Sequence, residues 1–217
     1  MIDYAAARTA MVDRQVRPSD VTRFPIIDAM LEVPRERFVP AALRSVAYAG
    51  EHLALGPGRV VLDPRTLAKM LDALDPGPED VALDLACGLG YSTAVLARLT
   101  AWTTGVEPDP AMARAAAATL AELEVDTAEV LEGAPAAGAP DGAPYTVMLL
   151  NGGAETVPQA LADQLAEGGR LALIRMEGAL GRCEIVTKTD GALSARAVFD
   201  ASAPVLDGFA QAAAFEF

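Results

Sequence analysis

Residues 81–99 read VALDLACGLGYSTAVLARL, and this stretch decides the fold. The apolar run at 81–85, which carries Asp84 near its end, predicts a buried parallel strand. Residues 87–90 predict a tight turn, and apolar residues at helical spacing predict a helix over 91–99. Small residues in such a turn let a ligand approach the backbone, and the first turn of a helix offers free N–H donors. The stretch therefore predicts a ligand site where the strand ends.

A second acid strengthens this prediction. Glu107 follows the strand-like run WTTGV and lies about 20 residues beyond the first acid, a common place for an acid that binds both hydroxyls of a ribose. The pattern indicates a cofactor that contains adenosine; the alternative is a β–α turn without a ligand. Ala86 and Thr93 stand where a dinucleotide fold has glycines. The motif therefore looks more like the S-adenosylmethionine turn of class I methyltransferases.

The composition limits the class of protein. The chain has 217 residues, 52% of them apolar, and a net charge of −13. These values predict one large domain, or one domain with an extension, and argue against nucleic acid as a partner. Cys87, Cys183 and a single histidine make no zinc-binding pattern, so no metal is predicted. Because there is no secretory leader and no apolar run of about 18 residues, we expect a cytoplasmic protein without a membrane partner.

The first third of the chain predicts short helices around a proline-rich connector. We expect a helix over 3–17 that Pro18 ends, and a second helix that Ser19 or Asp20 caps and that runs to about residue 31. A rigid connector at 33–40 and a short helix at 41–45 follow. Residues 59–62 could form a short strand, and Pro64 suits the first turn of a helix that continues to Leu74.

The remainder alternates between helical and strand-like segments. Helices are expected over 110–123 and 158–166, the second closed by the glycines at 168–169. Strands are expected over 127–131, 145–150, 171–176, 184–189, 195–199 and 209–217. Alternating strands and helices followed by late strands predict a doubly wound, mostly parallel sheet with antiparallel strands near its end.

At this point the chain resembles the protein-L-isoaspartate O-methyltransferases along nearly its whole length. The segments that carry the resemblance are MVDRQV (11–16), DAM (28–30), VPRERFVP (33–40), AY (47–48), LALGPGRVVLDP (53–64), DLACGLGYSTAVLARL (84–99), APY (143–145) and VPQALADQLAEGGRL (157–171). The resemblance implies a class I S-adenosylmethionine-dependent methyltransferase, an α/β fold with an N-terminal helical extension. Residues 1–65 would form that extension on the substrate side, and residues 66–217 the sheet domain.

The resemblance also implies an activity and a set of site residues. The family transfers a methyl group from S-adenosylmethionine to the free carboxylate of isoaspartyl residues in damaged proteins or peptides, which begins their repair. Glu107 would bind the ribose, and the residue after Gly133 would lie beside the adenine. The full set of implied cofactor-binding residues is Asp84, Ala86, Gly88, Gly90, Tyr91, Glu107, Pro108, Gly133 and Ala134.

Residues 60–64 depart from the family pattern. The family typically has a T-I-S-Q-P-like run where this chain has VVLDP, so Leu62 takes the place of a serine hydroxyl. Asp63 beside it would repel an incoming carboxylate when ionised. Arg59 and Arg65 flank the segment and could supply a positive field. Arg59 and Asp63 are therefore the candidate catalytic residues.

Two further departures leave alternatives open. The family's GDG run reads Gly133-Ala134-Pro135 here, so Ala134 has no side-chain acceptor for the adenine amino group. The small residues after the fourth strand become NGGA at 151–154. His52 lies near the expected active centre, where it could contact substrate or be an exposed loop residue. The chain could therefore methylate another acceptor, or be a non-catalytic member; its oligomeric state is not predicted.

Overall fold

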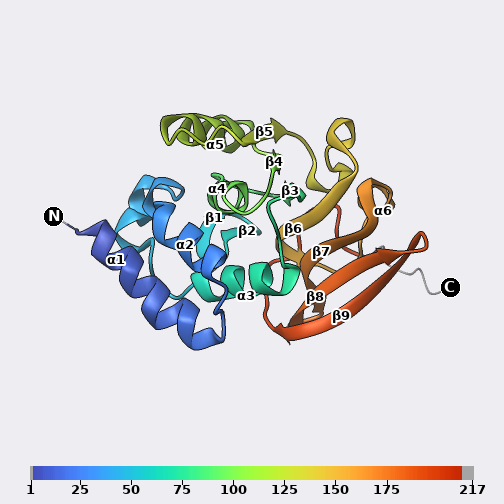
Figure 1. Ribbon diagram of the computed structural model, residues 1–217, viewed down its shortest axis with the longest axis horizontal. Coiled ribbons are helices and arrows are strands. Elements are labelled where there is room, and N and C mark those ends of the chain that lie inside the picture. Colours follow the sequence, from blue (N-terminus) through green and yellow to red (C-terminus); the bar gives the residue numbers. More distant parts are fainter. Residues whose placement is uncertain (1, 212–217) are drawn as a thin grey trace.

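The computed structural model describes residues 2–211, and a seven-stranded sheet forms its centre (Figure 1). The strands lie in the order β5-β4-β3-β6-β7-β8-β9, and the first five are parallel to one another. Strands β8 and β9 are antiparallel, as expected. The bounds of the seven strands are β3 Val81–Leu85, β4 Trp102–Glu107, β5 Ala128–Glu132, β6 Tyr145–Ala154, β7 Leu165–Glu177, β8 Leu180–Thr189 and β9 Ala192–Asp200.

The strand order places a topological switch point between β3 and β6. From β3 the chain continues through β4 and β5 on one side, then crosses to β6 and β7 on the other. In open α/β sheets, ligands bind beyond the carboxyl ends of the strands at such a point. The helices that connect these strands are α4 Tyr91–Ala97, α5 Pro110–Glu122 and α6 Gln159–Gln164.

The N-terminal part forms a helical layer beside the sheet (Figure 1). Helix α1 covers Tyr4–Met11 and continues through a π-helical turn, Val12–Val16, and a 3-10 turn, Arg17–Ser19. Helix α2 covers Phe24–Glu32. The expected cap at Ser19 or Asp20 is wrong, because Arg23 precedes the helix and Pro25 pre-organises its first turn. Two more 3-10 turns, Arg35–Arg37 and Ala41–Val46, match the expected connector and short helix.

A two-stranded hairpin and a long helix bring the extension to the sheet. Strands β1 Leu53–Gly56 and β2 Arg59–Val61 pair with each other and not with the central sheet. Helix α3 covers Pro64–Leu74, as the proline predicted. The Asp63 carboxylate accepts from the Thr66 amide at 2.9 Å and so caps this helix.

The structure corrects three boundaries in the second half. Strand β6 does not end at residue 150 but continues to Ala154, because Gly153 pairs with Val205 and with β7. Helix α6 ends at Gln164, and the glycines expected to close it lie inside β7. Of the strand expected at 209–217, residues 209–211 are not strand, and 212–217 lie outside the described residues.

One continuous core joins the two parts of the chain. Buried apolar side chains of α1, α2 and α3 belong to the same cluster as those of β6, β7 and β8. The two parts therefore share one core, and the boundary at residue 65 stays a prediction. Among the described residues, no helix is both long and apolar enough to cross a membrane.

Candidate functional site

The turn after β3 has an unusual backbone that its small residues permit. Ala86, Gly88 and Gly90 all have positive φ, at 56°, 60° and 91°. A side chain at Gly88 would place its Cβ 2.5 Å from the Leu55 Cδ1 atom, so the β1–β2 hairpin lies directly over the turn. Ala86 adopts this conformation with a Cβ, which costs about 1–2 kcal/mol. Strained backbone of this kind is often found at functional sites.

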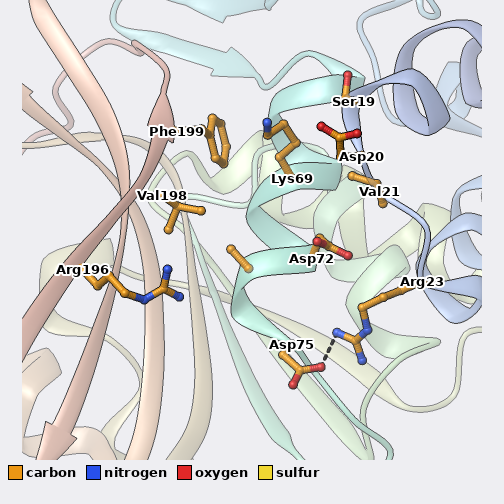
Figure 2. A pocket seen from close by; sticks show the side chains of 11 residues that line it. Ser19, Asp20, Val21, Arg23, Lys69, Asp72, Asp75, Arg196, Val198 and Phe199 are labelled. Carbon is orange, nitrogen blue, oxygen red and sulfur yellow. Dashed lines mark ion pairs between the residues drawn. The ribbon is translucent and has the colours of Figure 1, made fainter.

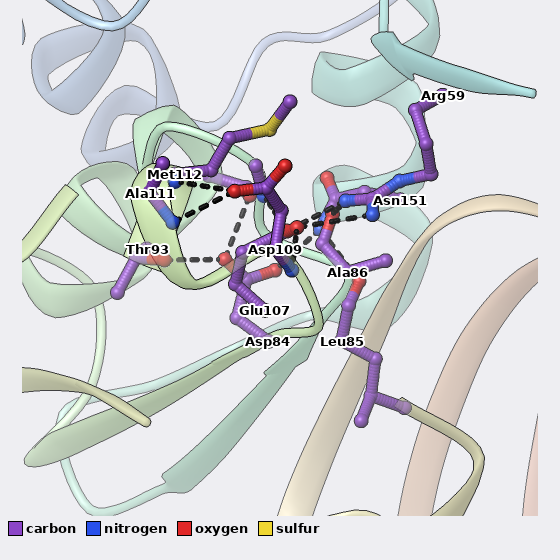
Figure 3. A network of polar contacts seen from close by, with 12 residues as sticks. Arg59, Asp84, Leu85, Ala86, Thr93, Glu107, Asp109, Ala111, Met112 and Asn151 are labelled. Atoms are coloured by element: carbon purple, nitrogen blue, oxygen red, sulfur yellow. Dashed lines mark hydrogen bonds and ion pairs between the residues drawn. The ribbon is translucent and has the colours of Figure 1, made fainter. Parts of the chain in front are cut away.

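Asp84 is fully buried and faces α4 and β6 (Figure 3). Its carboxylate accepts from the hydroxyls of Ser92 and Thr93 at 2.7 and 2.6 Å and from the Asn151 side-chain amide at 2.7 Å. Burial raises the pKa of Asp84 to about 6, although these three hydrogen bonds act in the opposite direction. Asp84 therefore joins β3, α4 and β6, and its carboxylate is engaged by protein side chains.

Glu107 ends β4 with its side chain wholly buried beside the turn. Its Oε2 atom accepts from the Gly88 amide at 2.7 Å, and its Oε1 atom from the Asp109 amide at 3.0 Å. Arg59 completes the set: its Nη1 and Nη2 atoms lie 3.0 and 2.6 Å from Oε1 and Oε2 (Figure 3). The predicted ribose acid is thus at the turn, but an arginine of β2 lies on it.

A cavity of about 200 Å³ opens beside this ion pair and gathers several predicted residues. Gly133 precedes the lining residue Ala134, and its amide holds this backbone to the end of β4 by donating to the Glu107 carbonyl oxygen at 3.1 Å. The cavity brings together three of the predicted cofactor residues and one predicted catalytic residue. Its lining is Pro57, Gly58, Arg59, Ala86, Pro108, Ala134, Pro135, Val205, Leu206 and Asp207.

The C-terminal segment 205–207 lines this cavity, and the sequence analysis missed it. The Gly153 amide donates to the Pro204 carbonyl at 2.8 Å, and the Leu206 amide donates back to the Gly153 carbonyl at 3.0 Å. Side chains at residues 152 and 153 would collide with this segment, since the Cβ positions lie 2.6 Å from Leu206 Cγ and 2.5 Å from the Ala203 carbonyl oxygen. The Gly152–Gly153 pair, expected only as small residues after the end of a strand, was the signal that another segment packs there.

The segment that departs from the family pattern lies on the other side of the turn. Leu62 is 1% exposed and, with Val60 and Val61, walls a very small cavity beside Cys87 and Tyr91. Apolar side chains nearly fill this space. Burial raises the pKa of the Cys87 thiol, which keeps it protonated and supports a packing role.

A buried arginine holds this segment in place. Arg35 is 0% exposed, donates to the carbonyl oxygens of Leu62 and Ala47 at 2.8 and 2.7 Å, and lies 4.7 Å above the Tyr91 ring. The predicted cofactor residue Tyr91 is therefore covered by the guanidinium and 2% exposed. Arg35 therefore connects the helical N-terminal part to residues on both sides of the turn.

The second predicted catalytic residue, Asp63, has structural partners. Besides capping α3, its carboxylate lies 3.2 Å from His52 Nδ1. His52 is not a free loop residue: it lies 2.9 Å from the Ser202 carbonyl through Nε2 and accepts from the Asp63 amide through Nδ1. The pair joins the hairpin to the C-terminal segment. Arg65 is exposed in the first turn of α3.

A larger cavity, of about 550 Å³, lies between α3, β9 and the segment 19–23 (Figure 2). Lys69 lies 4.8 Å above the Phe199 ring there, and Arg23 pairs with Asp75. It contains none of the residues predicted to bind the cofactor. Among residues 2–211, no three His, Cys, Asp or Glu side chains gather as a metal site would require.

Comparison with known sequences gives the family. The family described as "Protein-L-isoaspartate(D-aspartate) O-methyltransferase (PCMT)" matches residues 7–200. A protein-L-isoaspartate O-methyltransferase of Pelotomaculum thermopropionicum is 38% identical over 167 residues, 77% of this chain and 73% of that protein. Another, of Methanoregula boonei, is 36% identical over 184 residues, 85% of this chain and 84% of that protein.

Solved structures agree on the fold. A structure described as protein-L-isoaspartate O-methyltransferase superposes with a TM-score of 0.81 at 21% identity, over 93% of this chain and 67% of that one. A beta-aspartate methyltransferase of Plasmodium falciparum, solved with S-adenosyl-L-homocysteine, gives a TM-score of 0.79 at 18% identity, over 96% of this chain and 100% of that one. The expected class I methyltransferase fold is thereby confirmed. From residue 7 to residue 200, in sequence and in fold, the chain belongs to the protein-L-isoaspartate O-methyltransferase family.

Proposed function

We propose that this chain transfers a methyl group from S-adenosylmethionine to the carboxylate of isoaspartyl residues in damaged proteins or peptides. The observation that carries the proposal is the family match over residues 7–200, which contains the whole turn and the acid that ends β4. Relatives that are 34–39% identical carry the name of this activity.

The residues at the turn fit the proposed cofactor. At Gly88 the turn has bare backbone under the Leu55 side chain, and the two oxygens of the buried Glu107 carboxylate, which Arg59 contacts, lie beside the 200 Å³ cavity that Arg59 lines. We assign Glu107 to the ribose and Gly88 and Gly90 to the methionine side, with Pro108 and Ala134 on the adenine side. Bound there, S-adenosylmethionine supplies a methyl group on a positively charged sulfur.

The chain's own residues then have to position the acceptor and exclude water. A carboxylate is already ionised near pH 7, so no general base is needed. Holding it in line with the methyl carbon is mainly a matter of orientation. The apolar wall of Val60, Val61 and Leu62 excludes water from the turn, and Arg35 fixes that wall through the Leu62 carbonyl.

A methyltransferase with another acceptor is the second candidate, and one observation favours it. Leu62 fills the space where the family places a hydroxyl, so no side-chain donor from this position reaches the acceptor. The catalytic roles of Arg59 and Asp63 stay predictions, because Glu107 and the first turn of α3 engage their side chains. The alternative of a β–α turn that binds no ligand would leave the strained backbone of Ala86 unexplained.

The proposal extends to partners and location. A net charge of −13 disfavours nucleic acid, so we propose a peptide or protein acceptor. Cys87 and Cys183 are buried free thiols, which suits a reducing compartment such as the cytoplasm.

The test is transfer of labelled methyl from S-adenosylmethionine to two peptides that differ only in one isoaspartyl or aspartyl linkage. The proposal expects base-labile label on the isoaspartyl peptide and little on its partner. Equal label on both, or label on neither with the cofactor bound, would favour the second candidate or a non-catalytic role.

A further inference from the structure

We propose that Arg59 occupies the place of the cofactor's ribose on Glu107 and thereby sets the affinity of the site for its cofactor. The inference rests on the proposed function, since it takes Glu107 as the ribose acid. Arg59 lies in the β1–β2 hairpin, at the start of β2.

The acceptor positions of the Glu107 carboxylate are all filled. A carboxylate has about four lone-pair sites on its two oxygens. In Glu107 all four have donors: the amides of Gly88 and Asp109 take one each, and the two Nη atoms of Arg59 take the others. Two ribose hydroxyls cannot donate to this carboxylate until a donor leaves.

One of these donors can leave. The Gly88 amide belongs to the turn after β3, and the Asp109 amide belongs to the cap of α5, so both are fixed by regular structure. Arg59 reaches Glu107 with a long side chain from a hairpin that is paired outside the central sheet. The Arg59 guanidinium is therefore the donor that must leave Glu107 before two ribose hydroxyls can bind there.

Arg59 presents two parallel N–H donors, one to each carboxylate oxygen, as a vicinal diol would present two O–H donors. Its side chain is 17% exposed and lines the 200 Å³ cavity. Its remaining contacts hold it weakly: the bond to the Ala86 carbonyl is 3.3 Å long, and Nε has no partner within the described part of the chain.

Calorimetric titration with S-adenosylhomocysteine tests the inference on three variants. Arg59→Met removes both donors at similar length, and Arg59→Lys keeps the charge without the fork. Arg182→Met is the control, because Arg182 pairs with exposed Glu177 between β7 and β8. Thermal unfolding of each variant verifies that it is folded.

We expect Arg59→Met to bind about tenfold more tightly than the natural chain, the factor for 1.4 kcal/mol, with Arg59→Lys between them and Arg182→Met unchanged. Binding by Arg59→Met when the natural chain shows none would also support the inference. Equal or weaker binding by a folded Arg59→Met would overturn it while leaving the proposed function intact. No binding by any variant would overturn it together with the assignment of the cofactor.

Discussion

Arg35 donates from Nη2 to the Leu62 carbonyl oxygen at 2.8 Å, across a fully buried contact between the 3-10 turn Arg35–Arg37 and the segment 60–62 beside the turn after β3. No carboxylate pairs with this guanidinium among the ion pairs of the described chain. Desolvation lowers the pKa of Arg35, and the nearby Tyr91 opposes that effect. Its stabilising partners are two carbonyls and an aromatic face.

This contact predicts a loss of stability on substitution. In Arg35→Met the carbonyls of Leu62 and Ala47 would stay buried without a donor, at about 1–3 kcal/mol each. Relief of the buried charge offsets part of that cost, so we expect the free energy of unfolding in urea to fall by about 2–4 kcal/mol. The control is Arg37→Met, two residues along the same turn, which loses only an exposed pair with Glu122. Equal losses in both variants would contradict the anchoring role.

Asp84 predicts a specific dependence of stability on pH. Its pKa rises from 3.8 unfolded to about 6 folded, so the folded state binds the proton more tightly. The contribution to stability is complete below pH 3.8 and is lost as the pH rises through about 6, by about 3 kcal/mol in total. We compare the free energies of unfolding of the natural chain and Asp84→Asn between pH 4 and 7. As the pH rises, the natural chain should lose free energy of unfolding relative to Asp84→Asn. A difference between the two that does not change with pH would show that burial does not raise the pKa of Asp84.

Residues 62 and 63 predict a gain of activity. Leu62→Ser restores a hydroxyl beside the turn, and Asp63→Asn removes the charge while keeping a residue that caps α3 well. We expect the double variant to raise transfer to an isoaspartyl peptide about tenfold at saturating peptide, the factor for 1.4 kcal/mol. Because Leu62 is buried, replacing it with the smaller serine lowers the free energy of unfolding of the variant by about 2–5 kcal/mol. The rate is therefore measured below its unfolding temperature, with Asp63→Asn alone as control. A folded double variant without any gain would show that the hydroxyl is not what limits the reaction.

Local patterns predicted the parts of the fold that depend on neighbouring residues. The turn at 87–90, the acid at the end of β4 and the proline start of α3 are each coded within a few positions, and the structure has all three. Gly168 and Gly169 resemble a helix cap locally, but they lie inside β7, between Leu165 and Arg170, which both pair with β6. Tertiary pairing overrode the local signal there.

The parts that could not be predicted depend on contacts between distant segments. Arg59 meets Glu107 because the β1–β2 hairpin lies over the turn, and no spacing within the sequence encodes that position. Asp207 lines the cavity because the C-terminal segment pairs with Gly153, beyond the expected end of β6. Ser92, Thr93 and Asn151 meet at Asp84 only once α4 and β6 are placed.

If the turn after β3 and Glu107 form the cofactor site, Glu107→Gln weakens cofactor binding, which a calorimetric titration of S-adenosylhomocysteine into that variant measures. The matched control is Glu132→Gln, because Glu132 is exposed, ends the adjacent parallel strand and pairs with Glu107 in register. We predict that the dissociation constant rises about tenfold or more in Glu107→Gln, since a charged acceptor for the ribose is lost, and is unchanged in Glu132→Gln. Binding by a folded Glu107→Gln as tight as that of the natural chain would contradict the account.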